Sequence, residues 1–183
     1  FSGCTSLTSI TIPEGVTSIG CQTFSYCGLT SITIPEGVTS IEMSAFEGCE
    51  SLTSVIIPES VTSIDYDAFR DCTSLTSITI PESVTSIGGW IFGECTSLST
   101  IVVDENNVVY DSRDNSNAII ETETNKIVAG CKNTIIPASV KVIGKYAFEA
   151  IDTFTEIRLP DTLEVVEDYA YLNCANVNLL ILS

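Results

Sequence analysis

One sequence motif recurs along almost the whole chain at a nearly constant spacing. Its first marker is a proline, and successive prolines are 22 or 23 residues apart except for one interval of 56: Pro13, Pro35, Pro58, Pro81, Pro137 and Pro160. An aromatic residue recurs with the same intervals: Phe24, Phe46, Phe69, Phe92, Phe148 and Tyr171. Two independent markers give one period, which predicts a solenoid whose units stack only on their neighbours.

Each period contains a short segment in which apolar and hydroxyl residues alternate before the proline. Ile10 and Ile12 point to one side of such a strand, while Ser9 and Thr11 point to the other. Proline cannot donate a hydrogen bond to a β-ladder and therefore ends the strand. The pattern predicts eight strands with these inward positions: Leu7/Ile10/Ile12, Leu29/Ile32/Ile34, Leu52/Val55/Ile57, Leu75/Ile78/Ile80, Leu98/Ile101/Val103, Cys131/Thr134/Ile136, Phe154/Ile157/Leu159 and Val177/Leu180/Leu182.

A second apolar pair follows each proline, and the recurring aromatic residue then plugs the coil. Val16 and Ile19 form this pair in the first repeat, on a return leg that leads to Phe24. A single repeat buries too few large apolar side chains to offset the entropy lost when its backbone is ordered. We therefore expect the coils to be stable only as a stack.

The long interval marks an insertion of ten residues in the fifth coil. Asp104 stands at the proline position, and 33 residues separate it from Pro137. Within the inserted segment, 105–130, residues 118–121 and 126–128 read as a β-hairpin after a turn-rich stretch. The strand that begins at Cys131 is expected to survive. The hairpin either covers a coil that lacks its own apolar residues or serves as a recognition loop.

The repeat, written Leu-x-x-Ile-x-Ile-Pro-x-x-Val-x-x-Ile-Gly-x-x-Ala-Phe-x-x-Cys, closely resembles the BspA-type (Treponema-type) leucine-rich repeat. The resemblance covers nearly all of residues 1–183. It implies a single β-rich, right-handed solenoid of about eight 23-residue coils with one hairpin insertion. It also implies a surface protein of anaerobic bacteria or parasitic protists. Because Phe1-Ser-Gly-Cys4 matches the end of a repeat, we expect the sequence to be part of a longer secreted or cell-surface protein.

The charge of the chain excludes several classes of partner. The net charge is −17, from 24 acidic and 7 basic residues, and Arg70 is the only base in the first 100 positions. Such a surface repels phosphate groups, which argues against nucleic acid and anionic membranes. No apolar run is long enough for a membrane span.

The sequence offers little chemistry for catalysis or for a cofactor. It contains no histidine and no Cys-x-x-Cys pair, so histidine-based triads and the usual zinc sites are excluded. Six of the eight cysteines share one repeat position, which predicts a ladder of reduced, buried thiols rather than disulfides: Cys4, Cys27, Cys49, Cys72, Cys95 and Cys174. Cys21 lies off this ladder and is the thiol expected to be exposed and reactive. No enzyme activity and no cofactor are predicted.

Acidic residues follow the prolines in a row that repeats with the coils: Glu14, Glu36, Glu59, Glu82, Glu105 and Asp161. Neighbouring carboxylates repel each other, so the row does not favour folding. It either maintains solubility or collects cations such as calcium. Asp111, Asp114 and Asn117 form a second, weaker calcium candidate, because they lack the glycine and the glutamate of an EF-hand loop.

The outward positions of the strands form the candidate binding surface, since leucine-rich repeats usually bind partners there. This row begins at Thr11 and contains an apolar patch of Ile56, Val102 and Ile135. The residues that we assign to partner binding are Thr33, Ile56, Thr79, Val102, Ile135 and Arg158. The same residues also suit a strand that binds nothing, because β-branched side chains favour strands.

Aromatic residues share one further repeat position, just before the turn of the coil. Trp90, Tyr146 and Tyr169 stand there, and we expect Trp90 and Tyr146 to pack against the hairpin. Two functions remain open. The first is a monomeric binding module for a protein or glycan, such as a host matrix component, acting in adhesion. The second is a structural spacer that presents another domain.

Overall fold

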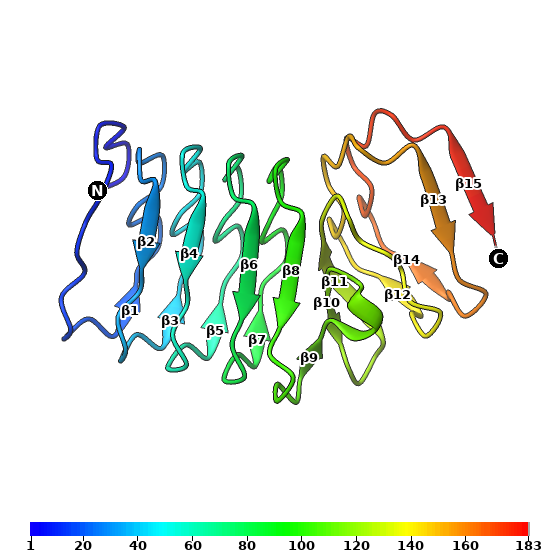
Figure 1. Cartoon of the computed structure of the whole chain (residues 1–183), viewed down its shortest axis with the longest axis horizontal. Coiled ribbons are helices and arrows are strands. Elements are labelled where there is room, and N and C mark those ends of the chain that lie inside the picture. The colour runs from blue at the N-terminus through cyan, green and yellow to red at the C-terminus, as the bar shows by residue number, and fades with distance from the viewer. Residues whose placement is uncertain (183) are drawn as a thin grey trace.

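The computed structural model describes residues 1–182, which form an elongated stack of coils with the two termini at opposite ends (Figure 1). Its regular elements are short strands and one 3-10 helix. They are β1 (Ser18–Ile19), β2 (Ser31–Thr33), β3 (Ser40–Ile41), β4 (Ser54–Ile56), β5 (Ser63–Ile64), β6 (Ser77–Ile80), β7 (Ser86–Ile87), β8 (Thr100–Val103), β9 (Tyr110–Asp111), η1 (Arg113–Asn115), β10 (Ala118–Glu121), β11 (Lys126–Gly130), β12 (Val142–Ile143), β13 (Glu156–Leu159), β14 (Val165–Val166) and β15 (Leu179–Leu182). Among these described residues, no helix is long and apolar enough to cross a bilayer.

One face of the stack consists of the strands that the alternating pattern predicts. Here β2 pairs with β4, β6 with β8, and β13 with β15, always in parallel and one repeat apart. Ile78 and Ile80 of β6 are buried, whereas Ser77 and Thr79 are exposed, as alternation requires. We call this surface the strand face. The side chain of Leu182, the last predicted inward position, lies outside the described residues.

Two of the eight predicted strands are not formed. Residues 7–12 are not a strand, and a single backbone bond, from Thr30 N to Thr8 O, joins them to the next coil there. Residues 131–136 are also irregular, so the prediction that this strand survives the insertion is wrong. Ile135 N donates to Ser116 O, and Thr134 Oγ1 donates to Asn117 O, which turns this segment toward the inserted residues.

The return legs form the opposite face. β1, β3, β5 and β7 make one parallel sheet in that order, with Ser18 opposite Ser40 and Ile41 opposite Ile64. The predicted hairpin is present as β10 and β11, in a second sheet of order β14-β12-β11-β10-β9. Strand β11 pairs in parallel with β12, so Ile127 takes the place of the usual return-leg isoleucine. The hairpin therefore completes the fifth coil.

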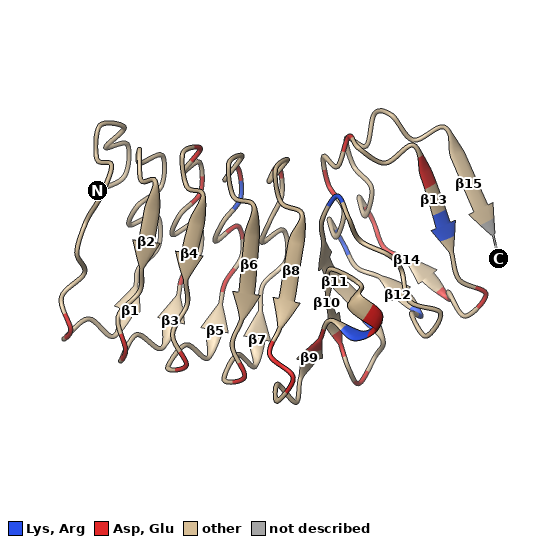
Figure 2. Cartoon of the chain, in the orientation of Figure 1, with Lys and Arg blue, Asp and Glu red and all other residues tan. Residues whose placement is uncertain are grey.

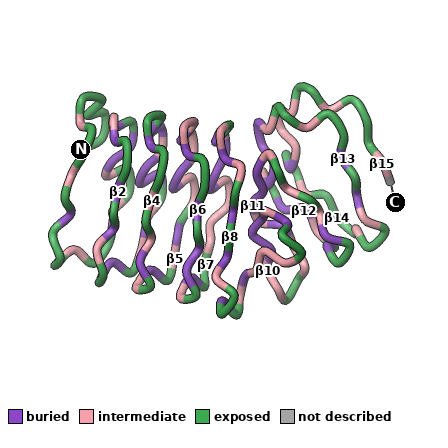
Figure 3. Tube along the Cα trace, in the orientation of Figure 1, coloured by how far each residue is buried: buried purple, intermediate pink, exposed green. Residues whose placement is uncertain are grey.

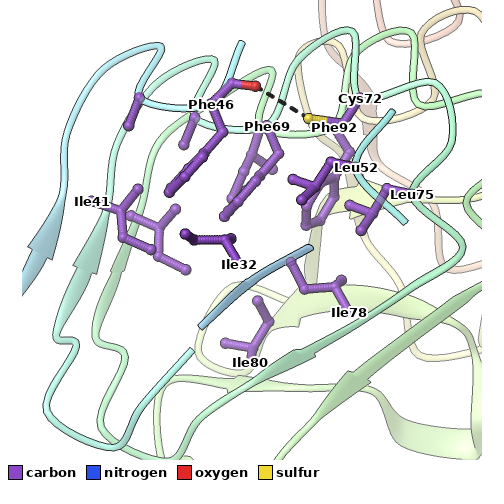
Figure 4. Packing of buried hydrophobic residues seen from close by; sticks show 14 of the residues in the cluster. Ile32, Ile41, Phe46, Leu52, Phe69, Cys72, Leu75, Ile78, Ile80 and Phe92 are labelled. Atoms are coloured by element: carbon purple, nitrogen blue, oxygen red, sulfur yellow. Dashed lines mark hydrogen bonds between the residues drawn. The ribbon is translucent and has the colours of Figure 1, made fainter. Parts of the chain in front are cut away.

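The core is a column of apolar side chains between the two faces (Figures 3 and 4). The aromatic plugs stack on one another, with ring centroids 5.5 Å apart for Phe24 and Phe46 and 5.4 Å apart for Phe46 and Phe69. The buried residues form two clusters, one reaching from Ile12 to Cys131 and a smaller one around Phe148. The column is divided in this way because the fifth coil has no aromatic plug of its own.

The cysteine ladder is buried in its central coils. Cys49 Sγ donates to Phe24 O at 3.0 Å, and Cys72 Sγ donates to Phe46 O at 3.2 Å, as the dashed line in Figure 4 marks. All eight cysteines are free thiols, and burial raises the pKa of Cys49 to about 11. The ladder departs from the expectation at its ends, where Cys4 is exposed and Cys174 is half-buried.

Each coil that carries an aromatic plug from Phe24 onward turns through two residues with left-handed backbone. One lies two positions before the aromatic plug and the other two positions after it, and most of these residues are not glycine: Gln22, Tyr26, Ser44, Gly48, Asp67, Asp71, Trp90, Glu94, Tyr146, Ala150, Tyr169 and Asn173. The turns are joined between coils, since Ser44 N donates to Tyr66 O and Phe46 N donates to Ala68 O. These bonds offset the cost of the left-handed conformation.

Candidate functional site

The predicted binding row lies on the strand face and runs through the strand pairs β2–β4 and β6–β8 before an irregular segment interrupts it. Thr33 is directly opposite Ile56 in the β2–β4 pair, and Thr79 is opposite Val102 in the β6–β8 pair. All six assigned residues are exposed, Arg158 on β13 among them. The structure thus brings four of them together as adjacent pairs. Ile135 lies on an irregular segment, and Arg158 lies on β13 in the last pair of strands.

The row is apolar and uncharged over most of its length. The exposed fractions are 62% for Ile56, 43% for Val102 and 68% for Ile135. Strands β2, β4, β6 and β8 carry no charged residue, and the acidic residues gather at the turns of the coils instead (Figure 2). A strongly acidic molecule therefore presents a neutral strip of hydroxyl and aliphatic groups on this face.

A groove opens beside the row where residues 131–136 diverge from β13. It has a volume of about 280 Å³ and is lined mainly by Ile135, Ile136, Phe154, Ile157 and Tyr171. Among the described residues, no backbone hydrogen bond joins segment 131–136 to Glu156, Ile157 or Arg158. The guanidinium of Arg158 forms an ion pair with Glu156 at the rim.

Three of the aromatic residues before the turns form a stack of their own. The ring centroids of Trp90 and Tyr146 are 4.3 Å apart and those of Tyr146 and Tyr169 are 5.4 Å apart, with the ring planes of both pairs nearly parallel. Tyr66 meets the edge of Trp90 at 6.1 Å. We expected Trp90 and Tyr146 to pack against the hairpin, but they pack face to face because the fifth coil has no turn between them.

Arg70, the only base of the first 100 residues, lies in a group of carboxylates beside this stack. Its Nη1 is 3.3 Å from Glu47 Oε1 and 3.4 Å from Asp71 Oδ2, and its Cζ lies 4.7 Å from the centroid of Trp90. Burial, together with the charge of Glu47, raises the pKa of Asp67 to about 6. Burial likewise raises the pKa of Glu149 to about 7.

The structure gives no support to the calcium candidates. Both carboxylate oxygens of Asp111 accept hydrogen bonds from Arg113, with Nε to Oδ1 at 2.8 Å and Nη2 to Oδ2 at 2.6 Å. Within residues 1–182, no three acidic or thiol side chains are placed to hold a metal ion together. The acidic row contributes one carboxylate per turn.

Cys21 is exposed, as the sequence indicates, but its surroundings make it a weak nucleophile. Its Sγ donates to Glu42 Oε2 at 3.4 Å. This hydrogen bond and the negative charge of Glu42 raise the pKa of the Cys21 thiol. Because the thiolate is the reactive form, the predicted reactivity of Cys21 is held down.

Two features of this surface were missed by sequence reasoning. The groove depends on how segment 131–136 bonds to the insertion, and the only sequence signals were Cys131 and Thr134 at positions usually held by leucine and isoleucine. The cluster of carboxylates around Arg70, formed by Glu47, Asp67, Asp71 and Glu149, comes from three coils. Its signal was the isolated position of Arg70 among acids.

Comparison with known proteins gives one family and a set of similar folds. A family model for the BspA-type leucine-rich repeat region matches residues 1–120 and 120–183, in six copies. A leucine-rich cell surface protein of Faecalibacterium prausnitzii is 30% identical, with a TM-score of 0.78 over 98% of this chain. A leucine-rich repeat protein of Bacteroides ovatus is 25% identical, with a TM-score of 0.63 over the whole chain.

The pneumococcal vaccine antigen PcpA has the same fold, with a TM-score of 0.78, 21% identity and coverage of 87% of this chain and 41% of its own. The chain spans 56% of the Faecalibacterium protein and 57% of the Bacteroides protein. No curated protein matches it. The comparisons therefore identify the type of repeat and the fold, over about half the length of these relatives.

Proposed function

The chain belongs to the BspA-type leucine-rich repeat family, and from that premise we propose that it is a non-enzymatic binding module of a secreted or cell-surface protein. Its role is adhesion or interaction with a host. The name of the Faecalibacterium protein, a leucine-rich cell surface protein, supports the location. The absence of histidine from the sequence supports a role without catalysis.

The observation that carries the proposal is the exposure of Ile56, Val102 and Ile135 on an uncharged strip. The strand itself does not require an aliphatic residue at the outward positions, because Thr33 and Thr79 occupy equivalent positions in neighbouring coils. Large exposed aliphatic groups on one face supply the buried contact area that binding of a protein or glycan requires. The partner meets this strip away from the acidic turns.

Introducing negative charge on the strip tests the proposal. Ile56→Asp, Val102→Asp and Ile135→Asp are combined in one variant, and its binding to immobilised matrix proteins and glycans is measured by surface plasmon resonance. All three side chains point to solvent, so we expect the variant to remain folded by circular dichroism and to lose binding.

A matched control places the same three charges on exposed apolar residues outside the row. Met43, Val108 and Val165 have exposed fractions of 45%, 83% and 47%, and their replacement by Asp should leave binding intact. Equal loss of binding in both variants would show that net charge, rather than the strand face, decides binding, and would contradict the proposal.

A structural spacer is the second candidate, and one observation favours it. Threonine hydroxyls tie successive coils of the first part of the stack to carbonyls of the preceding coil, as in Thr39 Oγ1 to Thr17 O at 3.2 Å and Thr53 Oγ1 to Thr30 O at 3.0 Å. Such ties stiffen the stack whatever it binds. A parent chain that binds none of the immobilised matrix proteins or glycans would favour the spacer.

A further inference from the structure

The solenoid has a junction where its aromatic column is interrupted. The plugs stack in sequence from Phe1 to Phe92, and a second stack joins Phe148 to Tyr171. The fifth coil lacks a turn, so the turn that holds Trp90 directly meets the turn that holds Tyr146. The stacked rings of Trp90 and Tyr146 therefore connect the turns of two parts of the solenoid whose buried residues form separate clusters.

Glu149 lies in this contact and is almost completely buried. Its exposed fraction is 5%, and its Oε2 atom has no hydrogen-bond partner. A methyl group added to Gly93 would lie 2.7 Å from Glu149 Oε2 and 2.4 Å from Trp90 Nε1, so both side chains lie close to the backbone at Gly93, in the turn that also carries Trp90. Trp90 Nε1 also lacks a partner. The carboxyl group is thus enclosed between the two turns.

The charges around Glu149 favour its neutral form. Arg70 is the cation that faces it, and this guanidinium already pairs with Glu47 and Asp71. The ammonium group of Lys145 lies over the rings of Tyr146 and Tyr169, with its Nζ 5.1 and 5.8 Å from their centroids. The other titratable groups that interact with Glu149 are acids or neutral donors: Asp67, Asp71, Glu94, Tyr66 and Cys174. An ionised Glu149 therefore adds a buried charge to a site that is already negative.

We propose that this junction is a pH-operated joint, closed while Glu149 is protonated and loosened when Glu149 ionises. A neutral carboxyl group tolerates enclosure between Trp90 and Gly93 at a lower cost than a carboxylate, because Oε2 makes no hydrogen bond in the closed contact that would offset the loss of hydration. Burial raises the pKa of Glu149 to about 7 from its ordinary value of 4.5, so the closed contact loses stability as the pH rises through 7.

The joint bears on the arrangement of the strand face. Ile56 and Val102 belong to strands before the junction, and Arg158 belongs to β13 after it. Loosening the contact between the turns frees the later coils to shift relative to the earlier ones. A partner that spans both parts would then be held differently at acidic and at alkaline pH.

Trp90 reports on the joint directly, since it is the single tryptophan of the chain. The emission maximum of the full chain and its quenching by acrylamide are followed from pH 5 to pH 8.5. We expect a red shift and stronger quenching as the pH rises, with a midpoint near 7. Circular dichroism should stay constant over the same range, because the coils themselves remain folded.

Four variants assign the change to Glu149. Glu149→Gln should show the closed spectrum at every pH, whereas Glu164→Gln, at an exposed ion pair with Lys141, should keep the transition. Asp67→Asn should also keep a midpoint near 7. Gly93→Ala should force the contact apart and give the open spectrum even at pH 5. An emission that does not change with pH in the parent chain, or a transition that persists in Glu149→Gln, would overturn the proposal.

Discussion

The residues at the turns of this molecule share a backbone conformation rather than a side-chain type. Gln22, Asp67 and Trp90 adopt positive φ angles of 54°, 58° and 63°, a region that usually favours glycine. These side chains share no chemistry, so no residue type could have marked the position in the sequence. Gln22 N donates to Met43 O and Asp67 N donates to Gly89 O in the next coil, and the sequence does not encode such contacts locally.

Replacing Glu42 should activate Cys21. In Glu42→Gln the carboxylate that accepts from the thiol is removed, and with it the interaction that raises the pKa of Cys21. We expect faster alkylation of Cys21 at pH 8, measured by mass spectrometry of its peptide, while Cys72 stays unmodified in the folded chain because it is buried. Glu36→Gln is the control, and an unchanged rate in Glu42→Gln would contradict the assignment.

Asp67 should make stability depend on pH. Its folded pKa of about 6 lies above its ordinary value of 3.8, so its protonated form stabilises the native state at low pH and this contribution is lost as the pH rises through 6. The difference in unfolding free energy between Asp67→Asn and the parent should therefore shift in favour of the variant by on the order of 1 kcal/mol from pH 4.5 to pH 8, allowing for solvent screening. Urea denaturation measures this gain, and Glu82→Gln on the exposed acidic row should show none.

At the scale of the element, the hairpin is both an insertion and a replacement. Its position and its two strands follow from the sequence, because residues 118–121 and 126–128 are short segments rich in isoleucine and valine on either side of a turn. The effect of the hairpin on segment 131–136 could not be predicted from the sequence. Thr134 donates to Asn117 and Ile135 donates to Ser116, and only the folded chain brings these residues together. The groove beside β13 arises from that change of partner.

Gly130, at the end of β11, should not tolerate a side chain. A methyl group there would lie 2.1 Å from Phe148 Cε1 and 2.9 Å from Thr134 Oγ1. We expect Gly130→Ala to lower the unfolding free energy by about 1–3 kcal/mol, because a packed ring must move. Gly15→Ala provides the control, since no atom lies within 4 Å of the added methyl group. Equal urea midpoints for the two variants would contradict this packing.

The whole molecule is a one-dimensional array, and this property was predictable. The period, the inward isoleucines and the aromatic column all follow from spacing, because every coil repeats the same contacts with its neighbours. The candidate surface was predictable in part: the outward row is where alternation places it, but the groove and the junction at Glu149 depend on the coil that breaks the repeat.

Stability should therefore increase with the number of coils. Chains that end at Cys49, Cys72 and Cys95 contain successively more of the first aromatic column. Each added coil contributes an interface as well as its own residues, so we expect the urea midpoint to rise at every step, measured by circular dichroism. A midpoint that is the same for all three lengths would show that the coils fold independently.

The hairpin also bears on how such an array avoids assembling incorrectly. The first coils are so similar that a chain with one repeat looped out could still pair Ser40 or Ser63 with an equivalent serine. The hairpin cannot be exchanged in this way, because Ile127 finds its parallel partner only at Ile143. A single irregular coil thus gives a repetitive polypeptide one unambiguous point of alignment, from which the remaining coils can be counted.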